Sequence, residues 1–377
     1  MGNTRRGFGV LGPLQLTTDG TSVPLGAPKQ RAVLAMLVLN RNRAVSVDSL
    51  INAVWDQSPV PAARTSIHSY VSNLRRLLGS AGYDPNTVLA SVSPGYQLSV
   101  ADADCDLGRF ITAKNAGVRA AAAGQFEEAS GYLAAALTEW RGPVLDDLSE
   151  FAFVDTFATA LNDVKVATQI GLAEADIACG RTDLVIPRLE LLSAEHPFRE
   201  PLWAQLITAY YVAERQSDAL NAYRRLKANL ADNLGIDPGP TLKTLHERIL
   251  RQEPLDTKRT AQTTAQHSAV DLGPHTITQA GVSAVAELRG KDGQRYPLDA
   301  STRIGRRPDN DIVLDDDDVS RYHAVVIDTE GSFVVSDLRS TNGVLVQGRR
   351  IRSSATLADG DHIRIGKHEF TFEIRAR

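Results

Sequence analysis

Hydrophobic positions divide the chain into three zones. Residues 7–100 mix short apolar runs with helical spacing, and residues 105–250 show helical spacing almost throughout. Residues 284–377 alternate between apolar and polar positions in short runs, with turn residues between them. The stretch 254–281 is rich in Thr, Gln, Ala and His and has no apolar period, which predicts a flexible linker.

In the first zone, short apolar strands are expected over 8–16 and 23–25. A helix is expected from Pro28, because the fixed backbone angle and missing donor of proline do no harm at the first helical position. A short helix over 47–55 and a longer one over 64–78 follow. The longer helix has one apolar stripe, formed by Ile67, Val71, Leu74 and Leu78.

The polar face of this third helix is the candidate DNA-binding surface. It carries short hydrogen-bonding groups and guanidinium groups, which suit phosphate oxygens and base edges in the major groove. Its members are Thr65, His68, Ser69, Ser72, Arg75 and Arg76. An ordinary amphipathic helix with a solvated polar face would show the same pattern. The next segment, 88–98, reads as strand, turn and strand with Pro-Gly in the turn, and such a wing favours the DNA-binding interpretation.

The second zone contains a loose helical repeat. Asp183 and Asp218 follow similar turns and lie 35 residues apart, close to the tetratricopeptide period of about 34. Hairpins of this kind bury their apolar faces by stacking on one another. One predicted helix face consists of Leu202, Trp203, Leu206, Ile207 and Tyr210. A packing domain without a ligand and a peptide-binding groove both fit this pattern.

The third zone carries four short clusters in order. They are Ile-Gly-Arg at 304–306, Asn-Asp-Ile at 310–312, Ser-Arg-Tyr-His at 320–323 and Ser-Thr-Asn-Gly at 340–343. Together they resemble the forkhead-associated domain, an all-β sandwich whose loops bind phosphothreonine peptides. The resemblance covers about residues 284–377 and implies a phosphothreonine site formed by Arg306, Ser320, Arg321, Thr341 and Asn342.

The chemistry of these residues suits a phosphate. Arg306 supplies a guanidinium, Ser320 supplies hydroxyl and backbone donors, and Arg321 adds a second cation. Asn342 has both a donor and an acceptor for an extended peptide backbone, and Thr341 is expected beside the phosphothreonine.

Three neighbouring residues are assigned to loop shape rather than to phosphate. They are Gly305, His323 and Gly343. The four aspartates 315–318 raise a separate question. Unless they point away from the phosphate, they should weaken its binding or favour basic residues around the phosphothreonine.

The first two zones resemble known regulators as well. Strands first and a wing last are typical of the winged helix-turn-helix of OmpR-like regulators. Leu-Gly-Pro-Leu at 11–14, Pro-Lys-Gln-Arg at 28–31 and Pro-Gly-Tyr at 94–96 are similar to stretches of the actinobacterial antibiotic-regulatory family. In that family a bacterial transcriptional activation domain follows, and residues 105–107, 140–142 and 234–240 look like it.

We therefore expect a multidomain α+β protein. Its parts are a winged-helix DNA-binding domain at 1–101, an all-α tetratricopeptide-like activation domain at 102–252, a linker at 253–283 and an all-β forkhead-associated domain at 284–377. This order resembles a group of actinobacterial regulators of cell-wall arabinan synthesis genes. The resemblance implies two partners, double-stranded promoter DNA and an autophosphorylated receptor-like Ser/Thr kinase, with RNA polymerase as a further candidate.

Composition adds limits to this interpretation. Hydrophobic residues make up 43% and charged residues 23%, as in ordinary globular proteins. The net charge of −4 includes an excess of +5 over residues 1–100, which fits a polyanion partner or a plain solvated surface. Cys105 and Cys179 form no disulfide framework or zinc-binding motif, which suits a reducing cytoplasm.

No signal peptide, membrane span or catalytic motif is recognised, so no enzyme activity, cofactor or metal is expected. Two functions remain. One is a kinase-responsive transcription activator. The other is an interaction protein that titrates or inhibits the kinase and has little promoter activity.

Overall fold

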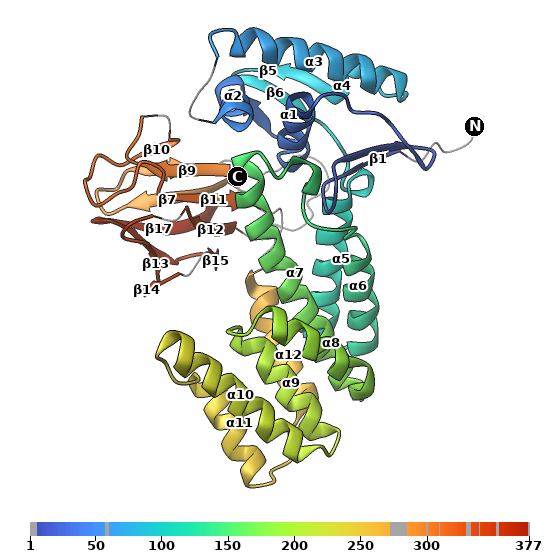
Figure 1. Ribbon diagram of the computed structural model, residues 1–377, viewed down its shortest axis with the longest axis vertical. Helices are drawn as coiled ribbons and strands as arrows, with labels where there is room; N and C mark the ends of the chain where they lie inside the picture. The colour runs from blue at the N-terminus through green and yellow to red at the C-terminus, as the bar shows by residue number, and fades with distance from the viewer. Residues whose placement is uncertain are drawn as a thin grey trace. The chain divides into compact units, whose positions relative to one another are not determined.

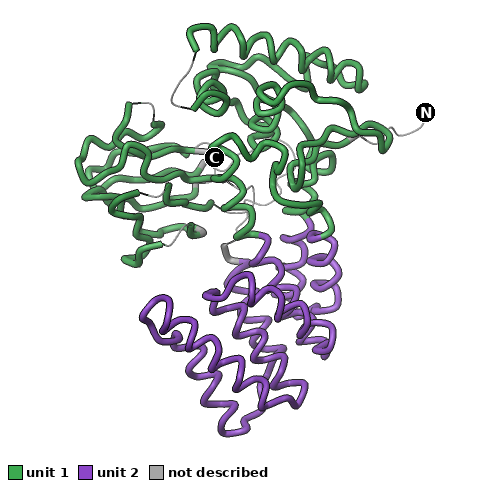
Figure 2. Tube along the Cα trace, in the orientation of Figure 1, with its two compact units in different colours: residues 1–112, 138–164, 271–377 green, residues 113–137, 165–270 purple. Residues whose placement is uncertain are grey.

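The computed structural model describes residues 6–56, 60–271, 285–298, 301–308, 310–328, 333–338, 340–351 and 354–375 (Figure 1). The chain forms two compact units (Figure 2). One comprises Met1–Thr112, Thr138–Val164 and Asp271–Arg377, and the other comprises Ala113–Leu137 and Lys165–Val270.

The N-terminal zone begins with a small antiparallel sheet in the order β1-β2-β3. Its strands are β1 (Arg6–Gly9), β2 (Gln15–Thr18) and β3 (Thr21–Ser22). The single strand expected over 8–16 is interrupted, because the carbonyls of Leu11 and Gly12 accept from the backbone of Arg141 and Leu145 instead. The strand expected over 23–25 is wrong: β3 lies before it, at Thr21–Ser22, and Pro24, which has no N–H to donate, cannot continue the ladder.

A winged helix follows, as predicted. Its elements are α1 (Pro28–Leu39), β4 (Ala44–Ser46), α2 (Val47–Trp55), α3 (Ala63–Ser80), α4 (Pro85–Val88), β5 (Leu89–Val92) and β6 (Gly95–Leu98). The Ser46 hydroxyl caps α2 by accepting from the Ser49 N–H at 3.0 Å. The apolar stripe of α3 is buried, and β5 and β6 form the wing beside β4.

Four of the motifs that resemble the antibiotic-regulatory family lie close to a joint inside the first unit, those at 11–14, 28–31, 105–107 and 140–142. The buried Asp106 carboxylate accepts from the N–H groups of Val10 and Leu11 at 2.9–3.0 Å and pairs with Arg141 at 3.2 Å. Asp147 accepts from the Leu14 N–H at 2.7 Å and pairs with an α1 arginine at 2.6 Å. The joint therefore fixes the N-terminal sheet to the start of the helical zone.

The helical zone consists of stacked hairpins. Its elements are η1 (Asp102–Asp104), α5 (Asp106–Ala122), α6 (Phe126–Thr138), η2 (Asp146–Leu148), α7 (Ala152–Ala178), α8 (Thr182–Glu195), α9 (Glu200–Val212), α10 (Gln216–Leu234) and α11 (Pro240–Leu250). The predicted apolar face of α9 is confirmed, because all five of its residues are buried and Trp203 is fully so.

The segment expected as a linker over 253–283 starts with a further helix, α12 (Thr257–Asp271). Ala261 and Ala265 are buried in small clusters with alanines and Phe126 of the second unit. The prediction of structureless chain is therefore wrong for α12. The hydrophobic pattern missed it because the buried positions are alanines. The rest of the expected linker, 272–283, lies outside the described residues.

The C-terminal zone is an all-β sandwich of two sheets. Their strand orders are β10-β9-β11-β12-β15 and β14-β13-β16-β17-β7-β8. The strands are β7 (Val285–Gly290), β8 (Arg295–Pro297), β9 (Ser301–Gly305), β10 (Ile312–Val313), β11 (Ala324–Asp328), β12 (Phe333–Asp337), β13 (Val344–Val346), β14 (Arg349–Arg350), β15 (Ser354–Leu357), β16 (His362–Ile365) and β17 (His368–Arg375). Apolar residues from both sheets, such as Ile304, Val326 and Phe372, form the core.

Candidate functional site

Two loops of the sandwich are joined by backbone hydrogen bonds at the predicted phosphate site. β9 and β11 pair antiparallel, with Ile304 opposite Ala324. Beyond the strands, the Arg306 N–H donates to the Ser320 carbonyl at 3.0 Å. A Cβ at position 305 would collide with the carbonyl oxygen of Arg321, so the close approach of the loops requires Gly305.

His323 connects a third loop to this pair. Its ring is fully buried; Nδ1 accepts from the Ser320 N–H at 3.0 Å, and Nε2 lies 3.1 Å from the Gly343 carbonyl. A carbonyl can only accept, so Nε2 carries the hydrogen and the ring is neutral. The prediction that His323 shapes the loops agrees with these contacts.

The polar side chains on these loops keep groups free for a ligand. The Ser320 hydroxyl accepts from the Thr341 N–H at 3.1 Å, so its own hydrogen can be donated elsewhere. Asn342 donates through Nδ2 to the Asp318 carbonyl at 2.8 Å. Asn342 is exposed, and within the described part of the chain its Oδ1 accepts no hydrogen bond.

The two predicted cations differ in their surroundings. The Arg306 guanidinium is 42% exposed and pairs with Asp317, Nη1 to Oδ1 at 2.7 Å. Arg321 is exposed, and its backbone carbonyl accepts from the buried Asn310 amide at 2.8 Å. Arg306, Ser320, Arg321, Thr341 and Asn342 therefore lie on loops that hydrogen bonds hold together, and their assignment to phosphothreonine remains a prediction.

Lys367 forms ion pairs with two of the four aspartates at 315–318. Its ammonium lies 3.3 Å from Asp316 and 3.1 Å from Asp318. A hydrogen bond from the Asp318 N–H is the main cause that keeps the pKa of Asp316 below its ordinary value, and the two carboxylates raise the pKa of Lys367. Sequence reasoning missed Lys367, since it stands 51 residues from Asp316 in the turn between β16 and β17.

Arg350 is a second residue that the sequence patterns did not indicate. Gly343 has φ +76°, and a Cβ there would collide with the Arg350 guanidinium. The exposed Arg350 therefore lies directly beside the loop of Thr341 and Asn342. Gly343 serves both the left-handed turn and this close approach, which agrees with its predicted conformational role.

On the candidate DNA-binding helix α3, five of the six predicted residues are exposed. They are Thr65, His68, Ser69, Ser72 and Arg76. The Ser69 hydroxyl donates to the Thr65 carbonyl at 3.1 Å, and the Arg76 guanidinium donates to the Asn73 side-chain oxygen at 3.2 Å. His68 Nδ1 lies 2.6 Å from the Tyr96 hydroxyl on the wing. This face presents hydrogen-bonding groups along the helix, and its contact with DNA stays a prediction.

Arg75 is the exception on α3, because it is committed to the wing. Its Nε and Nη2 donate to the Leu89 carbonyl at 2.9 and 2.8 Å, and Nη2 also reaches the Ser91 hydroxyl at 2.9 Å. The guanidinium lies 5.7 Å from the centre of the Tyr96 ring. Within the chain, Arg75 therefore ties the third helix to the wing.

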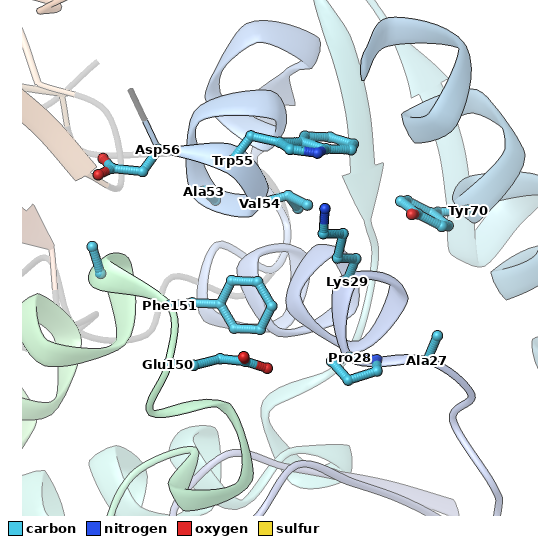
Figure 3. A pocket seen from close by; sticks show the side chains of 11 residues that line it. Ala27, Pro28, Lys29, Ala53, Val54, Trp55, Asp56, Tyr70, Glu150 and Phe151 are labelled. Carbon is cyan, nitrogen blue, oxygen red and sulfur yellow. The ribbon is translucent and has the colours of Figure 1, made fainter. Parts of the chain in front are cut away.

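A groove of about 700 Å3 lies beside the winged helix (Figure 3). Trp55 stacks on Tyr70 with 6.4 Å between ring centres, Lys29 lies 4.9 Å from the Trp55 ring, and Phe151 faces them. None of these residues was predicted as part of a site.

Three family profiles match the chain in the order of the zones. "Transcriptional regulatory protein, C terminal" matches residues 20–98, "Bacterial transcriptional activator domain" matches residues 105–250, and "FHA domain" matches residues 302–366. The chain is 63% identical over 374 residues to the transcriptional regulatory protein EmbR of Mycobacterium tuberculosis, covering 99% of this chain and 96% of that protein.

The chain belongs to the EmbR family of transcriptional regulatory proteins. It is also 54% identical over 250 residues to the regulator MoaR1 of Mycobacterium tuberculosis, covering 66% of this chain and 80% of MoaR1. The solved structure described as Mycobacterium tuberculosis EmbR in complex with low affinity phosphopeptide superposes with a TM-score of 0.96. It is 62% identical and covers 100% of this chain and 99% of that one.

Membership in the EmbR family confirms the main sequence predictions. The chain is a transcriptional regulator and not an enzyme, with a winged-helix region, a helical activator domain and a C-terminal forkhead-associated sandwich. Within the described residues, no helix has both the length and the apolar character needed to cross a membrane.

Proposed function

We propose that this EmbR-family regulator binds promoter DNA and receives its signal as phosphothreonine on a Ser/Thr kinase. The observation that carries the proposal is the loop cluster around Arg306, Ser320 and Asn342. It brings together a guanidinium, a hydroxyl with a free hydrogen and an amide with a free acceptor. The related structure of Mycobacterium tuberculosis EmbR is described as a complex with a phosphopeptide, which supports the same use of this domain here.

We assign promoter contacts to α3 and the wing. The exposed face of Thr65, His68, Ser69, Ser72 and Arg76 lies on the helix that enters the major groove in winged-helix proteins. Arg75 holds the wing against this helix, so both elements can meet the duplex together. The proposed targets are cell-wall arabinan synthesis genes.

The proposed partners are an autophosphorylated receptor-like Ser/Thr kinase and, through the activator domain, RNA polymerase. The proposed location is the cytoplasm, where promoter DNA and RNA polymerase are found. We propose functional boundaries at 1–101 for DNA binding, 102–252 for activation and 284–377 for phosphothreonine binding.

The test is a gel shift of the full chain with an arabinan-synthesis promoter fragment, with and without kinase and ATP. The proposal predicts specific binding that increases on phosphorylation, and a kinase-dead enzyme should give no increase. An alternative is an interaction protein that titrates the kinase. That alternative predicts no specific shift in either condition together with reduced kinase activity, and this outcome would overturn the transcriptional part of the proposal.

A further inference from the structure

The four aspartates beside the phosphate site have different environments. Asp316 and Asp318 both lie against Lys367, and the Asp318 N–H donates to the Asp316 carboxylate at 3.0 Å. Asp315 is exposed. Asp317 alone pairs with Arg306, the guanidinium predicted to hold the phosphate, at 2.7 Å.

The loop that carries Asp317 is anchored on both sides. Before it, Asp316 accepts from the Lys367 N–H at 3.2 Å, and after it, the Asp318 carbonyl accepts from Asn342 at 2.8 Å. The Val319 N–H closes the turn onto the Asp316 carbonyl at 3.0 Å. Because the backbone is fixed, the Asp317 side chain, which is 97% exposed, can leave Arg306 by rotation alone.

We propose that Asp317 is an internal competitor for Arg306 that lowers the affinity of the site for every anion, so that only strongly bound anions occupy it. This inference rests on the proposed phosphothreonine-binding function. Without a ligand, the Asp317 carboxylate neutralises the guanidinium. A ligand must displace this carboxylate, which then stays as an unpaired negative charge next to the bound anion.

The competition selects against weak anions. A phosphothreonine dianion offers three strong acceptor oxygens and about −1.5 to −2 charges, so it can replace a single carboxylate on Arg306. A Glu or Asp side chain of a peptide carries the same single charge as Asp317 and lacks the advantage of being held in place. Asp317 therefore lowers the affinity for both kinds of ligand, and the more weakly held carboxylate ligand is the one left without measurable binding.

The exposure of the pair limits the size of the effect. Asp317 and Arg306 are both open to solvent, and exposed ion pairs contribute little in water. Replacing Asp317 by Asn removes the charge and keeps the shape, so we expect phosphopeptide affinity to rise about three- to fivefold. Asp315→Asn removes the same charge from the same run without touching Arg306, and it should change affinity less than about twofold in physiological salt.

The experiment is calorimetric titration of the full-length wild type, Asp317→Asn and Asp315→Asn. The probe is a phosphothreonine peptide whose other residues are uncharged, compared with the same peptide carrying glutamate instead. We expect Asp317→Asn to bind the phosphopeptide more tightly than both other proteins, and its affinity for the glutamate peptide to rise as well.

Equal affinities of Asp317→Asn and Asp315→Asn for the phosphopeptide would overturn the inference while leaving the proposed function intact. If all three proteins ignore the phosphopeptide, the proposed function itself is wrong and the inference falls with it.

Discussion

Arg75 on the candidate DNA-binding helix α3 and Arg306 in the sandwich loops are both predicted to contact phosphate, but their partners in the structure differ. Arg75 donates to a backbone carbonyl and a hydroxyl and lies over an aromatic ring. Arg306 pairs with one exposed carboxylate. An exposed ion pair contributes about 0–1 kcal/mol and is easily exchanged, whereas a three-partner arrangement is not. The tertiary partners of an arginine therefore decide whether it is free for a ligand.

The largest expected effect is on Arg306. Arg306→Ala should weaken phosphopeptide binding about 10- to 150-fold, because a charge-assisted hydrogen bond contributes about 1.5–3 kcal/mol. Arg289→Ala is the matched control, since Arg289 also pairs with an acid of the sandwich, Glu373 at 2.6 Å, but on β7. Titration calorimetry measures both, and equal losses in the two variants would contradict the assignment of Arg306.

The next effect concerns Arg75. Arg75→Ala should lower promoter affinity about tenfold by releasing the wing from α3, since several hydrogen bonds are lost at once. The expected signature is faster amide hydrogen exchange over 89–92 in the free protein. If exchange is unchanged and only DNA binding falls, Arg75 contacts DNA directly and the contrast with Arg306 is lost.

Arg76 is expected to contact a phosphate of the DNA backbone and to make no contact with the bases. Arg76→Ala is expected to weaken binding to all DNA sequences about fivefold and to reduce the salt slope of the binding constant by about one, without altering exchange in the wing. Fluorescence anisotropy over a range of salt concentrations gives the slope. A slope equal to that of the wild type would show that Arg76 is not at the DNA backbone.

The smallest expected effect is a difference in pH dependence between phosphopeptide binding and promoter binding. The second pKa of a phosphothreonine is about 6, so lowering the pH from 7.5 to 5.5 should weaken phosphopeptide binding about fourfold as the dianion is protonated. The phosphodiesters of DNA do not titrate in this range. Promoter and phosphopeptide affinities measured side by side should therefore diverge, and equal changes in both would argue against recognition of the dianion.

Much of the fold could be predicted from the sequence, because local patterns were strong. The helix over 47–55, the apolar stripe of α3 and the wing all follow from hydrophobic spacing and turn residues. The helix α12 could not, since Ala261 and Ala265 carry too little hydrophobic signal to stand out from a linker.

The candidate site was predicted only in part. Its four motifs mark the loops, and His323 and Gly343 have the loop roles assigned to them. Two neighbours of the site were not foreseen, because Lys367 in the turn between β16 and β17 and Arg350 on β14 are distant from its motifs in sequence. Nothing in the run of four aspartates singled out Asp317 as the one that pairs with Arg306.

The central claim is that the sandwich loops recognise phosphothreonine. The most direct measurement is calorimetric titration of the full chain with one phosphothreonine peptide and with its unphosphorylated version. We predict saturable one-to-one binding of the phosphorylated peptide and no measurable binding of the other. Equal affinity for the two peptides, or binding of neither, would contradict the claim.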